Sequence, residues 1–222
     1  MLAALIVLAV FLFGGLCFTY LFFDDERLLW RLAAGNIVSC ATAGVSGFVI
    51  TLFFGLSATT AGVSVLTALL PAVILLKADV RTKLARDWQR ARSNFQHGNK
   101  RIGGLIFYSF FFILFCLFFS QAIYQTPDGI FTGGSQNLGD LPFHLGAIFS
   151  FTDGANFPPM NPSFSGVKFA YPFVADLLTA LTIKLGGSVR AALVVEDITW
   201  AFSLLVLLER FTVRVTLSKL AG

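Results

Sequence analysis

Residues 103–124 read GGLIFYSFFFILFCLFFSQAIY, and this stretch decides the fold class. It contains no charged side chain, and Gln121 and Tyr124 stand at its end. A helix that crosses a bilayer needs about 20 consecutive, mainly apolar residues. The stretch therefore predicts a membrane-spanning helix.

The composition of the whole chain agrees with this prediction. Hydrophobic residues make up 56% of the 222 residues and charged residues 13%, with a mean hydropathy of +0.80. A soluble domain is about one quarter charged, so this chain has too few polar residues to cover a surface in water. The 26 Phe suit lipid-facing and interhelical positions, because Phe is large and needs no hydrogen-bond partner. We expect an all-α integral membrane protein.

Three further predicted spans precede this one, at residues 1–23, 33–55 and 57–76. Charged residues from Asp24 to Arg27, followed by Trp30 and Arg31, are expected to separate the first two spans. No cation precedes Arg27, which favours a retained helix over a cleaved signal peptide. Pro71 is expected to kink the third span near its end.

Residues 77–101 form a basic segment with eight cations against Asp79 and Asp87, a net charge of +6. Apolar residues recur within it at helical spacing, namely Leu84, Trp88, Ala91 and Phe95. This pattern predicts an amphipathic helix on the membrane surface, in contact with anionic lipid rather than nucleic acid. Positive loops lie on the cytoplasmic side, so the segment is expected there, with the N-terminus and residues 125–170 on the exoplasmic side. The expected location is a bacterial inner membrane, with residues 125–170 in the periplasm.

The last third of the chain allows two topologies. Residues 171–186 are apolar but short and carry Asp176 and Lys184, whereas residues 190–209 are long enough to span. If both cross, there are six spans and the final cations lie outside. We expect instead five spans and an exoplasmic juxtamembrane helix at 171–186. The predicted units are thus residues 1–76, 77–102 and 103–222.

The candidate chemistry lies in the loop 125–170. Asp140 precedes a short apolar helix predicted at 141–151, and His144 follows one turn later on the same face. Asp140 is either a helix cap or a carboxylate that acts as general base or metal ligand beside His144. Lys168 either binds a phosphate or extends toward lipid headgroups.

A family resemblance rests on three short runs in this region. They are Gly139-Asp140-Leu141-Pro142-Phe143-His144, then Asn156-Phe157-Pro158-Pro159, then Tyr171-Pro172-Phe173. Together they resemble the first exoplasmic loop of the GT-C superfamily, membrane glycosyltransferases that use polyprenyl-phosphate-linked sugars. The resemblance covers about residues 103–215. It implies that Asp140 is the catalytic base and that Lys168 meets the lipid phosphate.

Two functions follow as hypotheses. Members of that superfamily carry more spans than this sequence, which favours a non-catalytic accessory subunit of a larger membrane complex, such as a respiratory or photosynthetic one. The alternative is an active GT-C glycosyltransferase, or one half of a split one. A transporter ranks last, because the first four spans carry almost no charge.

The expected partners are membrane lipids and other transmembrane subunits, with no nucleic acid. No cofactor is required, although lipid or carotenoid could lie on the Phe-rich faces, and a divalent metal is expected only if the chain is an enzyme. Cys17, Cys40 and Cys116 fall in apolar runs without metal-ligand spacing. His97 and His144 lie outside the predicted spans, so neither suits a haem.

Overall fold

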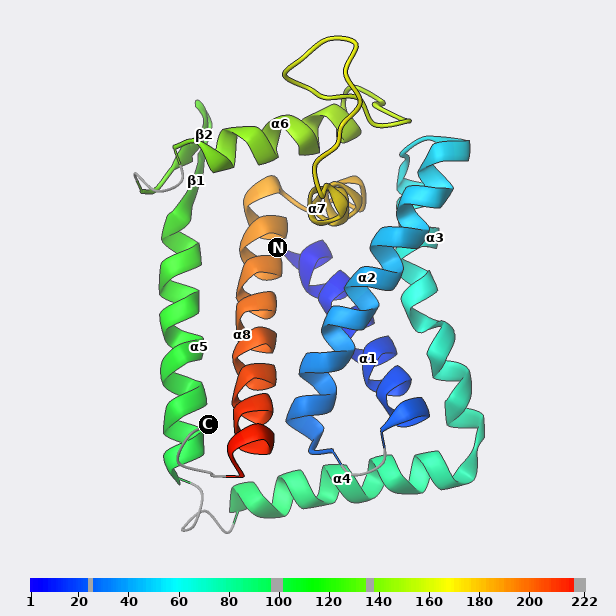
Figure 1. Ribbon diagram of the computed structural model, residues 1–222, viewed down its shortest axis with the longest axis vertical. Coiled ribbons are helices and arrows are strands. Elements are labelled where there is room, and N and C mark those ends of the chain that lie inside the picture. Colours follow the sequence, from blue (N-terminus) through cyan, green and yellow to red (C-terminus); the bar gives the residue numbers. More distant parts are fainter. Residues whose placement is uncertain (24–25, 97–101, 135–137, 218–222) are drawn as a thin grey trace.

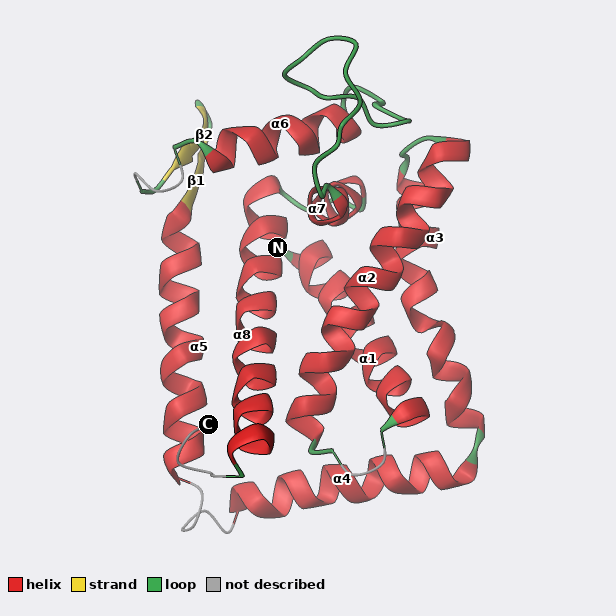
Figure 2. Ribbon diagram, in the orientation of Figure 1, coloured by secondary structure: helices red, strands yellow, loops and turns green. Residues whose placement is uncertain are grey.

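The computed structural model describes residues 1–23, 26–96, 102–134 and 138–217, and most of these are helical (Figures 1 and 2). Within them, five helical segments are long and apolar enough to cross a membrane. They are α1 (Leu2–Phe22), α2 (Leu28–Phe54), α3 (Ala58–Leu66) continued by the 3-10 helix η1 (Thr67–Leu76), α5 (Ile102–Ala122) and α8 (Val189–Thr216). The predicted all-α membrane architecture is confirmed.

Three helices lie across the ends of these spans. Helix α4 (Ala78–Gln96) crosses one end, while α6 (Asp140–Thr152) and α7 (Val174–Lys184) lie at the other (Figure 1). Helix α7 has 11 residues and is about 16 Å long, too short to cross a bilayer. Among the described residues, five helical segments are thus candidates to cross a membrane, and α7 is not one of them.

Helix α1 packs against both α2 and η1 through two glycines. A Cβ added to Gly15 would lie 2.0 Å from the carbonyl oxygen of Gly35 on α2. A Cβ added to Gly14 would lie 1.9 Å from the carbonyl oxygen of Ala68 on η1. The backbones thus touch where side chains are absent, which is how helices associate closely in lipid.

The start of α2 and the helix type around Pro71 differ from prediction. Helix α2 begins at Leu28, so Trp30 and Arg31 lie inside it and not in a linker. Arg31 can be helical because its charge is compensated by buried partners, described below. The segment around Pro71 is a ten-residue 3-10 helix rather than a kinked α-helix; proline has no N–H to give to the α-helical ladder.

A β-hairpin that was not predicted follows α5. Strand β1 (Ile123–Thr126) pairs antiparallel with β2 (Gly129–Thr132), from Ile123 opposite Thr132 to Thr126 opposite Gly129. Gly129 has φ of 148°, a conformation that favours glycine. The hairpin carries the chain from the end of α5 toward α6.

Helix α7 is held on the face of α2 by small residues. Gly44 and Gly47 of α2 lie against Val174 and Leu181 of α7. Leu181 is fully buried in a core shared with α1, α2 and α3. This packing fixes α7 at one end of the bundle and so positions the site described next.

Candidate functional site

The loop between the spans α5 and α8 folds into a layer over one end of the bundle (Figure 1). We call this layer, residues 140–184, the ledge. Its two helices share an apolar core in which Ala147, Ile148 and Phe151 of α6 meet Leu177 and Ala180 of α7. The ledge is thus a packed element and not an open loop.

Asp140 stands exposed in the first turn of α6. The residue before it, Gly139, is the N-cap, and the helix has no side-chain capping bond. The interpretation of Asp140 as a capping residue is therefore wrong. A carboxylate in the first turn is still favoured by the helix dipole, so the position suits an ionised side chain that faces outward.

His144 does not pair with Asp140, although the two are one turn apart on α6. Its Nδ1 lies 2.8 Å from Oδ1 of Asp176 on α7, a hydrogen-bond distance. The expected Asp140–His144 pair is thus replaced by a link between the two helices of the ledge. The spacing in the sequence gave no sign of it, since the partners are 32 residues apart.

Asp176 is the buried member of this link, with a residue exposure of 4%. Burial raises the pKa of its carboxyl group, and the hydrogen bond from His144 opposes that rise. Its second oxygen, Oδ2, is buried without a hydrogen-bond partner among the described residues. The sequence feature that could have identified Asp176 is the presence of an acidic residue within the apolar run 171–186.

Lys168 lies exposed on the loop between α6 and α7. The loop doubles back there, with an antiparallel bridge between Met160 and Lys168. Asn156 fixes the turn through bonds from its Nδ2 to the carbonyl oxygen of Met160 (2.7 Å) and from the Met160 N–H to its Oδ1 (2.9 Å). Among the described residues, no ion pair joins Lys168 to Asp140, so the ledge carries the predicted site residues without pairing these two.

Aromatic rings join this loop to α6. The ring of Tyr171 lies 4.9 Å from that of Phe143 and 5.8 Å from that of His144, edge to face in both pairs. Phe169 stacks on Phe173 at 5.7 Å between ring centres. Such pairs add about 0.5–1.5 kcal/mol each beyond burial, and they hold His144 beside the exposed surface.

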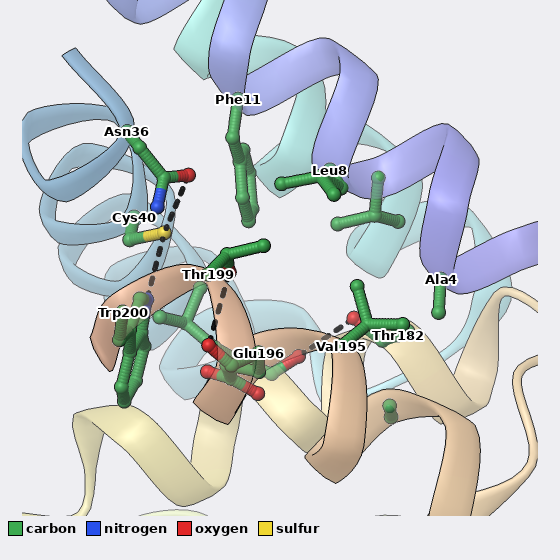
Figure 3. Close-up of a pocket in the computed structure, with 13 residues that line it drawn as sticks. Ala4, Leu8, Phe11, Asn36, Cys40, Thr182, Val195, Glu196, Thr199 and Trp200 are labelled. Carbon is green, nitrogen blue, oxygen red and sulfur yellow. Dashed lines mark hydrogen bonds between the residues drawn. The ribbon is translucent and has the colours of Figure 1, made fainter. Parts of the chain in front are cut away.

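A second carboxylate, Glu196, lies inside the span α8 beneath α7. Its Oε2 accepts a hydrogen bond from Oγ1 of Thr179 at 2.6 Å, and its Oε1 is buried without a partner among the described residues. Glu196 also borders a cavity of about 30 Å³ shared with Asn36, Cys40 and Trp200 (Figure 3). That volume holds about one or two water molecules. In the sequence, Glu196 stands near the start of the span predicted at 190–209, and no role was predicted for it.

The opposite end of the bundle holds a charged network around Arg31, which is 1% exposed. Its guanidinium donates to the carbonyl oxygens of Thr19 (3.1 Å) and Phe23 (2.7 Å), and its Nε lies 3.6 Å from Oδ2 of Asp87 on α4. Its Cζ also lies 4.1 Å from the ring centre of Tyr20. These contacts attach α4 to α1 and α2.

Glu26 extends this network to α8. Arg210 donates to its carboxylate at 2.9 and 3.4 Å, and Arg214 also pairs with it. The network compensates the buried charge of Glu26, which is 6% exposed. The network around Arg31 and Glu26 therefore has a structural role. The exposed side chains that are candidates for chemistry lie on the ledge.

No group of three or more His, Cys, Asp or Glu side chains suited to a metal ion lies among the described residues. No protein-family model, curated protein or solved structure matched the chain in the three comparisons made.

Proposed function

We propose that the chain provides the catalytic ledge of a membrane glycosyltransferase of the GT-C type, with Asp140 as general base. The observation that carries this proposal is the exposed carboxylate of Asp140 on a packed layer over the ends of two spans. A general base must reach the proton that it removes. An exposed carboxylate on a layer over one end of the spans is accessible both to a lipid-linked donor and to a soluble or membrane acceptor.

The proposed reaction is glycosyl transfer from a polyprenyl-phosphate-linked sugar. The acceptor hydroxyl gives its proton to the Asp140 carboxylate while its oxygen bonds to the anomeric carbon. The bond from that carbon to the phosphate oxygen breaks, and the electron pair leaves with the polyprenyl phosphate. Lys168 supports the leaving phosphate as a point charge, and His144, tied to Asp176, positions the first turn of α6 relative to α7.

For this function, we propose that the ledge lies on the outer face of a bacterial inner membrane and α4 on the cytoplasmic face. The support is the distribution of charge, since α4 and its preceding residue carry six cations against two carboxylates. The ledge carries Asp140 and Asp153 on its surface.

The variant Asp140→Asn tests the catalytic proposal. A lost general base reduces transfer of a labelled hexose from a polyprenyl phosphate hexose to membrane acceptors by about 100-fold or more. Membranes containing the full chain supply the assay, and donor binding should remain. Asp153→Asn, which removes an equally exposed carboxylate from the same layer, is the matched control and should keep full activity. Unchanged transfer by Asp140→Asn refutes the role of Asp140.

A second candidate is the accessory subunit, which a different observation favours. None of the residues in the apolar stretch of α5 that could span the membrane is buried. Phe110, Phe112 and Phe118 are 59%, 46% and 64% exposed. Such a face fits neighbouring transmembrane subunits, or bound lipid or carotenoid. A photo-crosslinker at Phe118 that captures a second protein, together with full activity of Asp140→Asn, would favour this function over the enzyme.

A further inference from the structure

An open groove lies where the end of η1 meets α4. It has a volume of about 540 Å³ and is lined by Leu75, Arg81, Leu84, Ala85 and Trp88. The lining is apolar apart from the guanidinium of Arg81. Sites for small ligands fall in the range of about 300–1,000 Å³, so the groove is large enough for part of a lipid.

The groove is a fixed feature because the adjacent face of α4 is attached to the spans. Val80 is 4% exposed and packs with Cys17 and Ile74. Asp87 accepts a hydrogen bond from the Tyr20 hydroxyl at 2.8 Å. These contacts set the rotation of α4 and leave Trp88 64% exposed at the groove.

A cation is held at the rim of the groove. Nη1 of Arg81 donates to the carbonyl oxygens of Leu75 (2.8 Å) and Leu76 (3.1 Å), at the end of η1. The guanidinium carries five N–H donors, and these contacts use one nitrogen. Arg92 follows Arg81 by 11 residues, close to three helical turns, and is exposed on the same side of α4.

The neighbouring surface of η1 favours lipid as the occupant. Leu70, Val73 and Leu76 are 71%, 66% and 78% exposed. They belong to a span, so in a bilayer they face acyl chains. The groove thus lies between an acyl-chain region and a helix with a net positive charge.

We propose that this groove binds one anionic phospholipid, with an acyl chain against Leu75, Leu84 and Trp88 and the phosphate on Arg81. Charge complementarity selects the headgroup, because residues 77–96 carry six cations against Asp79 and Asp87. Tryptophan also prefers this depth, where its ring meets both headgroups and chains.

Native mass spectrometry of the full chain, released from vesicles of equal phosphatidylglycerol and phosphatidylcholine, tests the proposal. The wild type should retain phosphatidylglycerol in preference. Arg81→Gln should reduce that retention about fivefold, the effect of one cation at a lipid surface. Arg86→Gln removes the same charge from the other side of α4 and should retain the lipid as the wild type does.

A second variant covers the case in which Arg81→Gln fails to fold. Ala85→Trp fills the groove while Arg81 stays, and it should also lose the retained lipid. Equal losses in Arg81→Gln and Arg86→Gln would overturn the proposal in favour of diffuse attraction. Equal retention of phosphatidylcholine, displacement by soluble glycerol phosphate, or a second protein copy in place of lipid would also overturn it.

Discussion

The hydrogen bond between His144 and Asp176 joins the accessible part of the ledge to its buried part. His144 is one turn from Asp140, and its side chain is 33% exposed, whereas the side chain of Asp176 is 4% exposed. A hydrogen bond to a charged group contributes about 1.5–3 kcal/mol. The link thus fixes the position of α6 relative to α7.

The raised pKa of Asp176 gives the fold a pH dependence of known sign. The ordinary pKa is 3.8, and burial raises it in the folded state. The folded protein then holds this proton more tightly than the unfolded chain, so stability falls as pH rises above 3.8. In Asp176→Asn the neutral amide does not titrate, and this fall should be smaller.

Thermal unfolding of the purified protein in detergent, followed from pH 4 to about pH 7, measures the effect. His144→Gln leaves Asp176 in place and removes the hydrogen bond that opposes the rise of its pKa, so in this variant the fall in stability should be at least as large as in the wild type. Parallel curves for the wild type and Asp176→Asn would show that this carboxyl group does not determine the pH dependence.

At the scale of elements, α1 and α2 cross closely because Gly15 and Gly35 have no side chains at the point of contact. Gly15→Ala would place a Cβ 2.0 Å from the Gly35 carbonyl oxygen, a backbone atom that cannot turn away. The helices must separate, and we expect a loss of about 3 kcal/mol or more in stability.

Gly104→Ala on α5 is the matched control for this crossing. No atom lies within 4 Å of a Cβ at Gly104, so the higher helix propensity of alanine should stabilise the protein by up to about 1 kcal/mol. Both variants are compared by thermal unfolding and by size-exclusion profile. Equal stability of the two would mean that the α1–α2 contact is not as close as described.

The spans could be predicted from the sequence because length and hydropathy decide them locally. The span predicted at 103–124 contains α5 except for its first residue, although its last two residues begin β1, and the short run at 171–186 contains α7. The start of α2 could not be predicted, since Arg31 is helical only through contacts with Thr19, Phe23 and Asp87. The partner of His144 was missed for the same reason, because contacts between distant residues leave no local pattern.

For the whole molecule, α8 is held at both of its ends, by the end of α5 at one and by Glu26 at the other. Arg190 at the start of α8 donates to the carbonyl oxygens of Ser120 (2.7 Å) and Ile123 (2.9 Å). Arg210 near the other end of α8 pairs with Glu26. The ledge therefore rests on a span that is fixed at both of its ends, which favours a stable placement of Asp140.

The difference in charge between the two ends predicts how the molecule lies in the membrane. The cations of α4 should keep that end in the cytoplasm, and the ledge should face outward.

Gln89 on α4 and Ser165 on the ledge are both exposed, so single cysteines placed there report the two sides. In a background with the three native cysteines replaced, Ser165→Cys should react with a membrane-impermeant maleimide in intact spheroplasts. Gln89→Cys should react only after the membrane is opened. The reverse pattern would place Asp140 in the cytoplasm, away from the outward-facing lipid-linked donor proposed for it.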